Sequence, residues 1–184
     1  MKNLTFITGN PGKAKQLSKY LGVPVNHYKL DLTEIQSVDL EKVIKHKVAE
    51  AFRILNVPVL VDDVGLTINS LGKLPGPFVK FFIQEIGNQG ICDLLKNNKD
   101  RSAYATVAIG YSDGGTPKIF TGVINGTISK VAIGDGGFGW DQIMIPEGYK
   151  ETRSQMNEKD YLATDPRKLA LAKFENFISK TDQK

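Results

Sequence analysis

Two adjacent aspartates, Asp62 and Asp63, follow the short apolar run Pro58–Val61. The run has the length and composition of a buried β-strand. Since neighbouring side chains of a strand point to opposite faces, both carboxylates serve one site only if the chain bends after Val61. Gly65 would permit such a bend, or the close approach of a ligand. The stretch predicts either a carboxylate site for a hard divalent cation such as Mg²⁺ or a plain polar turn at the end of a strand.

Strand-like and helix-like stretches alternate along the chain, which predicts an α/β protein. The expected strands cover residues 4–8, 23–30, 58–61, 102–112, 118–129 and 142–146. The expected helices follow the turn at 9–13 and cover 39–55, 78–86, 88–96 and 165–179, with a break at Gly87. Asp39 and Asp165 are expected to cap their helices, and residues 113–117 to join two strands into an antiparallel pair.

The composition is that of one globular domain over residues 1–184, with 41% apolar and 24% charged residues. A net charge of +4 suits an anionic small substrate, and the scattered lysines and arginines argue against a nucleic-acid-binding protein. One cysteine, Cys92, and two histidines leave carboxylates as the ligands for any metal. The sequence shows no signal peptide and no apolar run long enough to span a membrane, so a cytoplasmic protein is expected.

The glycine-containing turn Gly9–Lys13 joins an expected strand to an expected helix. This arrangement presents backbone N–H groups and a helix N-terminus to phosphate, and Lys13 adds a positive charge. The turn is not a Walker loop, because only two residues separate its glycines and Ala14 follows the lysine. A tight turn without a ligand is the alternative.

A second glycine-rich stretch, Gly134–Asp141, contains the pattern G-x-G-x-x-G. It leads into a strand and not into a helix, so it is not a dinucleotide-binding fingerprint. Its glycines flank Phe138, Trp140 and Asp141, a composition that suits a loop against which a planar ring can lie. By composition alone, an ordinary surface loop is the alternative.

In six segments that occur in the family's order, the chain resembles the inosine triphosphate pyrophosphatase family. The matching segments are Thr8–Lys13, Glu34–Gln36, Lys47, Asp62–Leu66, Pro75–Phe78 and Gly137–Asp141. The last segment agrees with the family's G-F-G-[YW]-D pattern at all five positions. The resemblance extends over nearly the whole chain.

The resemblance implies hydrolysis of the deaminated purine nucleoside triphosphates ITP, dITP and XTP to monophosphate and pyrophosphate, which clears them from the nucleotide pool. Mg²⁺ is the expected cofactor, with Mn²⁺ as an alternative. Glu34 and Asp63 are expected to bind the metal, with Asp62 as a further ligand. Asp63 would also orient or deprotonate the attacking water, and Lys13 is the second expected catalytic residue.

The substrate-binding residues that the resemblance implies fall into two groups. Those expected at the triphosphate are Thr8, Gly9, Asn10, Pro11, Gly12, Lys13, Lys47, Asp63, Val64 and Lys80. Those expected at the purine base are Phe138, Gly139, Trp140, Asp141 and Arg167. The resemblance also implies a homodimer, and an elongated central mixed sheet flanked by helices, with two lobes and a cleft between them.

The chain departs from the family pattern at three places. Val64 replaces a serine or threonine, Asp165-Pro166 replaces the Ser-His that precedes Arg167, and Tyr161 replaces a lysine. The departures leave two alternatives open. One is a nucleotide-binding protein of the same fold with weak activity, and the other is a pyrophosphatase with a different base preference.

Overall fold

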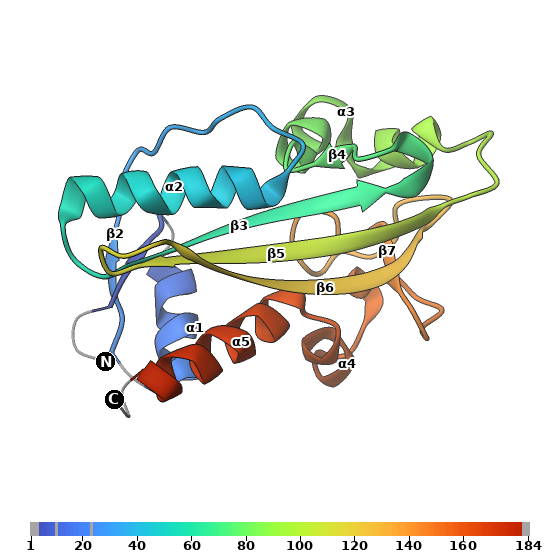
Figure 1. Ribbon diagram of the computed structural model, residues 1–184. Helices are drawn as coiled ribbons and strands as arrows, with labels where there is room; N and C mark the ends of the chain where they lie inside the picture. Colours follow the sequence, from blue (N-terminus) through green and yellow to red (C-terminus); the bar gives the residue numbers. More distant parts are fainter. Residues whose placement is uncertain (1–3, 10, 23, 182–184) are drawn as a thin grey trace. The chain divides into compact units, whose positions relative to one another are not determined.

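The protein is described by a computed structural model that covers residues 4–9, 11–22 and 24–181 (Figure 1). Its elements are β1 (Thr5–Ile7), α1 (Pro11–Leu21), β2 (Asn26–Tyr28), α2 (Leu40–Leu55), β3 (Val59–Ile68), η1 (Asn69–Leu71), β4 (Pro75–Gly76), α3 (Val79–Leu94), β5 (Ser102–Ser112), β6 (Lys118–Ile128), β7 (Met144–Pro146), η2 (Arg153–Gln155), α4 (Glu158–Ala163) and α5 (Pro166–Thr181). Among the described residues, no helix has both the length and the apolar character needed to cross a membrane.

Within the described residues, the strands form one mixed sheet of seven strands in the order β2-β1-β3-β5-β6-β7, with β4 paired to β3. Strand β1 pairs in parallel with β2 and β3, whereas the pairs β3–β4 and β6–β7 are antiparallel. Strands β5 and β6 are neighbours joined by the turn at residues 113–117, as predicted. The mixed α/β fold with flanking helices is therefore confirmed.

The chain divides into two compact units. The first comprises residues up to 63, 108–121 and from 170 onward, and the second comprises 64–107 and 122–169. The single domain that the composition indicated, and the cleft and the elongated shape that the resemblance implied, stay predictions.

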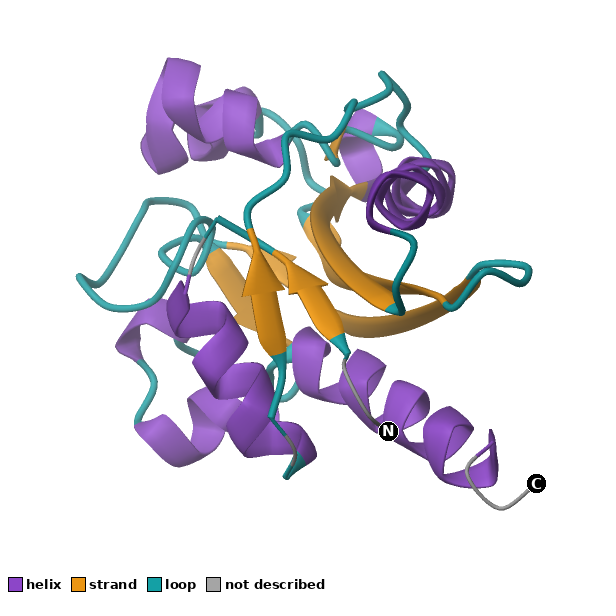
Figure 2. Ribbon diagram, turned by 90° about the vertical axis from the view of Figure 1, so that its left-hand side faces the viewer, coloured by secondary structure: helices purple, strands orange, loops and turns teal. Residues whose placement is uncertain are grey.

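In the first unit, helices cover both faces of the strands (Figures 1 and 2). The apolar side of α2 packs on one face, in a core cluster of Ile7, Ile44, Val48, Ala51, Val59, Val61 and Ala108. On the other face, the α5 rings Phe174 and Phe177 contact Tyr111 and Phe120, with ring centroids 5.4–6.0 Å apart. The core cluster fixes helix α2 and strand β3, which carry the polar residues described below.

In the second unit, α3 is broken at Gly87, whose backbone is non-helical at φ 67° and ψ 175°. The break confirms the predicted joint between two helices, because this conformation favours glycine. Beyond the joint, Ile91, Cys92 and Leu95 belong to the core cluster of this unit. Phe81, before the joint, is 53% exposed.

Strand β3 does not end at Val61, as the sequence suggested, but continues through the aspartate pair to Ile68. Gly65 produces no bend of the chain away from the sheet. It lies instead against the backbone of β4, where an added Cβ would be 3.2 Å from the carbonyl carbon of Gly76. Because the strand is continuous, Asp62 and Asp63 point to opposite faces of the sheet.

The N-terminus of α2 is capped by Asp39, as predicted. Its side chain accepts hydrogen bonds from the N–H groups of Glu41, at 3.0 Å, and Lys42, at 3.3 Å. We expect Asp39→Ala to lower the free energy of unfolding by about 1 kcal/mol, because these helix N–H groups lose their acceptor. Asp39→Asn retains an acceptor and should stay within a few tenths of a kcal/mol of the parent. Urea unfolding of the three proteins measures both effects, and equal stability of Asp39→Ala and the parent would contradict the prediction.

Candidate active site

Lys47 lies between two of the predicted metal ligands. It projects from α2 and is 9% exposed. Its Nζ donates to Glu34 Oε1 at 2.6 Å and to Asp63 Oδ2 at 2.9 Å. Two carboxylate oxygens from different segments, the loop before α2 and strand β3, thus converge on one cationic centre. The structure therefore brings together three residues that the resemblance assigned to phosphate and metal binding.

The protonation of Lys47 is set by this arrangement. Burial alone would lower the pKa of its ammonium, since desolvation disfavours the charged form. The charges of Asp63 and Glu34 and their hydrogen bonds outweigh burial and raise the pKa above its usual value. Lys47 is therefore a cation throughout the physiological range.

A second contact with α2 fixes the loop that carries Glu34. Glu50 Oε2 accepts a hydrogen bond from the N–H of Thr33 at 2.7 Å, and Glu50 Oε1 accepts one from the Thr33 hydroxyl at 3.0 Å. The Thr33 N–H, followed by its hydroxyl, lowers the pKa of the Glu50 carboxyl. No sequence pattern singles out Glu50, because a charged residue on a helix is usually a solvated one.

Asp62 is held by a different lysine. Its Oδ2 lies 3.5 Å from Lys13 Nζ, in the first turn of α1. The two aspartates of β3 thus pair with two different cations, as the alternation of a strand requires. That Asp62 binds the same metal as Asp63 stays a prediction. The alternation of side chains along β3 disfavours it.

The turn before α1 joins β1 to the helix as expected. The Thr8 N–H donates to the carbonyl of Tyr28 at 3.0 Å, and α1 begins at Pro11, a residue suited to the first helical position. Gly9 is exposed, and Gly12 lies in the first turn of the helix. The predicted Asn10 lies outside the described residues.

The donor set around Lys47 fits a hard divalent cation, provided that the substrate supplies further ligands. Glu34 and Asp63 already hold one positive centre, which shows that their oxygens can share a cation. Within the described parts of the chain, no group of three or more His, Cys, Asp or Glu side chains forms a ready-made metal site. Mg²⁺ commonly binds through one or two carboxylates plus phosphate oxygens, so two carboxylates suffice.

The predicted base loop presents one exposed ring. Phe138 is 73% exposed and stands between Gly137 and Gly139, both with positive φ. Trp140, by contrast, is buried in the core cluster of the second unit. Of the two predicted aromatic residues, only Phe138 offers a ring face on which a planar base could stack.

Asp141 ends this loop and is 4% exposed. Its Oδ2 accepts hydrogen bonds from the N–H of Phe138 at 2.6 Å and the hydroxyl of Tyr161 at 2.8 Å. Its Oδ1 accepts one from Arg153 Nε at 2.8 Å. Asp141 thus shapes the loop, and its contact with a base stays a prediction.

Two residues that sequence analysis missed hold the base loop in place. Arg153 in η2 forms the ion pair with Asp141 just described. Asn88, directly after the break in α3, donates from Nδ2 to the carbonyl of Gly139 at 2.9 Å and to Gln142 Oε1 at 3.1 Å. A buried aspartate in a glycine-rich loop implies a partner, but no local pattern identifies Arg153 as that partner.

The remaining predicted residues lie in the second unit. Lys80 is exposed in the first turn of α3, and Val64 follows the aspartate pair in β3. Arg167 is partly buried in the first turn of α5, where its N–H donates to the capping carboxylate of Asp165 at 2.9 Å. The predicted cap of α5 is therefore confirmed, whereas substrate contacts of these three residues stay predictions.

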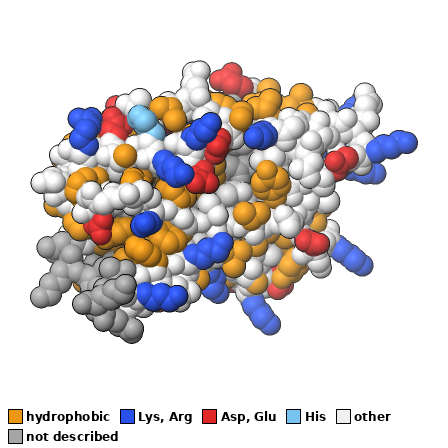
Figure 3. Space-filling model, in the orientation of Figure 1, with side chains coloured by type: hydrophobic (Ala, Val, Ile, Leu, Met, Phe, Trp, Pro, Cys, Tyr) orange, Lys and Arg blue, Asp and Glu red, His pale blue; other side chains and the backbone are white. Residues whose placement is uncertain are grey.

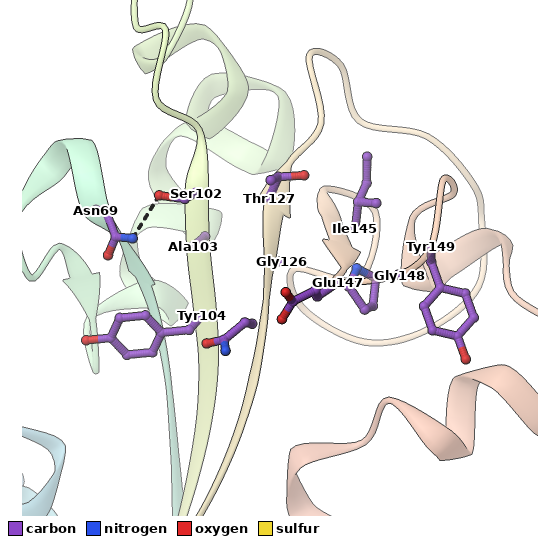
Figure 4. A pocket seen from close by; sticks show the side chains of 12 residues that line it. Asn69, Ser102, Ala103, Tyr104, Gly126, Thr127, Ile145, Glu147, Gly148 and Tyr149 are labelled. Carbon is purple, nitrogen blue, oxygen red and sulfur yellow. Dashed lines mark hydrogen bonds between the residues drawn. The ribbon is translucent and has the colours of Figure 1, made fainter.

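A pocket of about 440 Å³ lies elsewhere in the second unit (Figure 4). Side chains of β5, β6 and the segment 145–149 line it, among them Tyr104, Asn125 and Tyr149. None of the predicted site residues lines this pocket. The pocket therefore adds nothing to the assignment of the site.

The fold and the residues around Lys47 define a mixed α/β protein that gathers two carboxylates and one ammonium group at a single point. Comparison with known proteins gives the family: the model described as the Ham1 family matches residues 4–177. The chain belongs to this family.

Curated relatives agree over most of their length. The chain is 37% identical over 181 residues to a dITP/XTP pyrophosphatase of Saccharolobus solfataricus, covering 97% of this chain and 94% of the relative. It is 39% identical over 174 residues to inosine triphosphate pyrophosphatase 2 of Trypanosoma cruzi, covering 91% and 88%. These names confirm the resemblance that the six motifs carried.

Solved structures agree in fold. A HAM1 protein from Coxiella burnetii matches with a TM-score of 0.86 at 24% identity, covering 98% of this chain and 100% of that one. The Ham1 protein of Staphylococcus aureus matches with a TM-score of 0.85 at 22% identity, with the same coverage.

The contact between Thr33 and Glu50 predicts a pH dependence of the Glu34 loop. Because the folded pKa of Glu50 is lowered, its stabilising effect is present above the ordinary carboxyl pKa and is lost as pH falls through the folded value. We expect hydrogen-exchange protection of the Thr33 amide to be constant above about pH 5 and to decline below about pH 4. In Glu50→Gln the protection should be weaker and independent of pH, and protection that declines equally in both proteins would refute the assignment.

Proposed function

We propose that the chain is a nucleoside triphosphate pyrophosphatase that hydrolyses deaminated purine nucleotides such as ITP, dITP and XTP. The convergence of Glu34, Lys47 and Asp63 carries the proposal, because it gathers acidic and basic groups suited to a metal–triphosphate substrate. Membership of a family whose relatives are named pyrophosphatases supports the same reaction. The proposal includes Mg²⁺, with Mn²⁺ as an alternative, bound by Glu34 and Asp63 together with substrate phosphates.

The reaction divides the triphosphate at its first anhydride bond. Water attacks the α-phosphorus, the bond from that phosphorus to the bridging oxygen breaks, and pyrophosphate leaves. Asp63 would orient the water and accept its proton, while Lys47 donates a hydrogen bond to its Oδ2. A divalent cation, when bound, neutralises phosphate charge and polarises the phosphorus–oxygen bonds.

Lysines supply the rest of the charge compensation. Lys47 and Lys13 are held by aspartates of β3, and each can transfer hydrogen bonds to phosphate oxygens when substrate binds. Backbone N–H groups at the start of α1 favour an anion in the same way. Lys80 is proposed to add a further cation.

Base selection in this proposal depends on complementary hydrogen bonds. A 6-keto purine offers an acceptor at O6 and a donor at N1, whereas adenine reverses both, so a polar site for one leaves the other with unpaired groups. Phe138 would stack on the ring, and Arg167 would donate to the keto oxygen. Asp141 would act mainly by shaping the loop.

Further features complete the proposal. A homodimer and a cytoplasmic location are proposed from family membership and composition alone. Lysine and arginine side chains are dispersed over the face drawn in Figure 3, which suits a small anionic substrate better than a nucleic acid.

The substrate proposal is tested by pyrophosphate release in the presence of Mg²⁺. We expect kcat/KM for ITP and XTP to exceed that for ATP by at least about 100-fold, because adenine reverses the donor and the acceptor that a site for a 6-keto purine would pair. GTP and CTP are compared in the same assay. Omission of Mg²⁺ with a chelator present should abolish release. Comparable release from ATP would support an altered base preference, and no release from any nucleotide would refute the proposal.

The role of Asp63 is tested by Asp63→Asn. The amide cannot accept the proton from water, so we expect kcat to fall about 100- to 10,000-fold while nucleotide binding changes far less. Asp93→Asn, an exposed aspartate of α3, serves as the matched control and should keep the parental rate. A nucleotide-binding protein with weak activity, the second candidate, would show little turnover before the substitution and little change after it.

A further inference from the structure

Arg153 matches no motif, yet its side chain makes several polar contacts beside the base loop. Its side chain is 5% exposed. Its Nε donates to Asp141 Oδ1 at 2.8 Å, and its Nη1 donates to the carbonyl and, at 2.5 Å, to the hydroxyl of Thr164. Nη1 also donates to the carbonyl of Tyr161 at 3.2 Å. One guanidinium therefore ties together two segments that are separate in sequence.

The first of these segments is the base loop. Asp141, held by Arg153, accepts the N–H of Phe138 and so fixes the backbone directly before the exposed ring. Gly137 has no space for a side chain, because an added Cβ would lie 2.6 Å from Asp141 Cβ. The neighbouring Ser154 adds a bond from its N–H to the Asp141 carbonyl at 3.0 Å. Two neighbouring residues of η2, Arg153 and Ser154, thus hold the loop through Asp141.

The second segment is the turn that leads into α5. Thr164, which receives Nη1, directly precedes the capping residue Asp165, and Asp165 accepts the N–H of Arg167. A shift of Thr164 would therefore move the first turn of α5. The loop with Phe138 and the turn with Arg167 are the two parts assigned to the base, and both depend on Arg153.

A lysine could not replace this guanidinium. Arg153 uses two different nitrogens, one toward Asp141 and one toward Thr164, in the fixed planar fork of its side chain. A lysine ammonium lacks this planar fork, so it would not reproduce both contacts in the same fixed geometry. The ring of Tyr161 also lies against the guanidinium. Arg153 Cζ is 4.2 Å from the ring centroid, and this contact favours the planar cation.

We propose that Arg153 is the positioning residue that sets base selectivity, by holding the loop 137–141 and the turn 161–165 in one fixed arrangement. The inference rests on the proposed function, because it concerns the base side of the same reaction. Arg153 acts through Asp141 and Thr164 and does not itself need to touch the substrate.

The test is Arg153→Lys, made in the full chain and compared with Arg101→Lys. Arg101 is a matched control in the same unit, since it also donates to several backbone carbonyls, including those of Leu95 and Ile128, but contacts no predicted site residue. We expect Arg153→Lys to raise KM for ITP about tenfold and to reduce the preference for ITP over ATP about tenfold. Inhibition by pyrophosphate, which lacks a base, should be unchanged. Arg101→Lys should lower Tm without altering the preference.

Binding gives a second readout that does not require turnover. Trp140 is the only tryptophan of the chain and lies within the base loop, so its fluorescence reports on that loop. IMP binding should weaken about tenfold in Arg153→Lys and remain parental in Arg101→Lys. If the parent binds IMP better than AMP but hydrolyses no nucleotide, the proposed function fails. The role of Arg153 is still decided in that case, by whether Arg153→Lys lowers the ratio of the IMP affinity to the AMP affinity.

Two results would overturn the inference. One is an unchanged preference for ITP over ATP in folded Arg153→Lys. The other is an equal loss for both nucleotides that follows the drop in Tm, as for a purely structural residue. If Arg153→Lys does not fold, Thr164→Val removes the hydroxyl that accepts from Nη1 and leaves the ion pair with Asp141. It should reduce the preference about threefold, and full retention of the preference in that folded variant likewise overturns the inference.

Discussion

The buried ammonium of Lys47 is the charge on which the arrangement of Glu34 and Asp63 depends. A cation removed from water is tolerated only when opposite charges and hydrogen bonds compensate it, here Glu34 at 2.6 Å and Asp63 at 2.9 Å. The requirement draws α2, the loop before it and β3 to one point. Because β3 continues without a bend, the pleat that directs Asp63 to Lys47 directs Asp62 to the opposite face, where Lys13 meets it.

In the second unit the buried cation is Arg153, and its charge is compensated by Asp141. Lys47 is a compact point charge shared by two carboxylates, and its three donors can rotate toward new acceptors when phosphate arrives. Arg153 is a planar fork whose Nε and Nη1 point to fixed acceptors, so its contacts favour one geometry. Each cation would suit its proposed task, since a phosphate site must exchange partners in every turnover, whereas a base loop must keep one shape to discriminate.

Local signals predicted most of the elements, and long-range contacts account for what was missed. The cap at Asp39, the break at Gly87 and the hairpin turn at 113–117 are each determined by residues next to one another in sequence. The end of β3 was misplaced because a polar pair resembles the end of a strand, while pairing with β4 continues the ladder to Thr67. The bonds from Thr33 to Glu50 and from Arg153 to Asp141 span 17 and 12 residues. No periodicity or motif encodes such pairs, so the supports of the site could not be predicted even where its motif residues were.

The departure from the family at position 161 has a physical explanation in this arrangement. Tyr161 donates its hydroxyl to Asp141, and its ring lies 4.2 Å from the guanidinium carbon of Arg153. A lysine at this position would place a second cation against Arg153 beside the same carboxylate, and like charges at short range in a buried site are strongly disfavoured. A tyrosine instead supplies one donor to Asp141 and an aromatic face to the cation. Its pKa is raised by burial and by the hydrogen bond to Asp141, so the hydroxyl stays protonated and keeps donating. Tyr161 and Arg153 therefore act together on Asp141. The positive charge beside this carboxylate comes from Arg153 of η2, and not from a lysine at position 161 of α4.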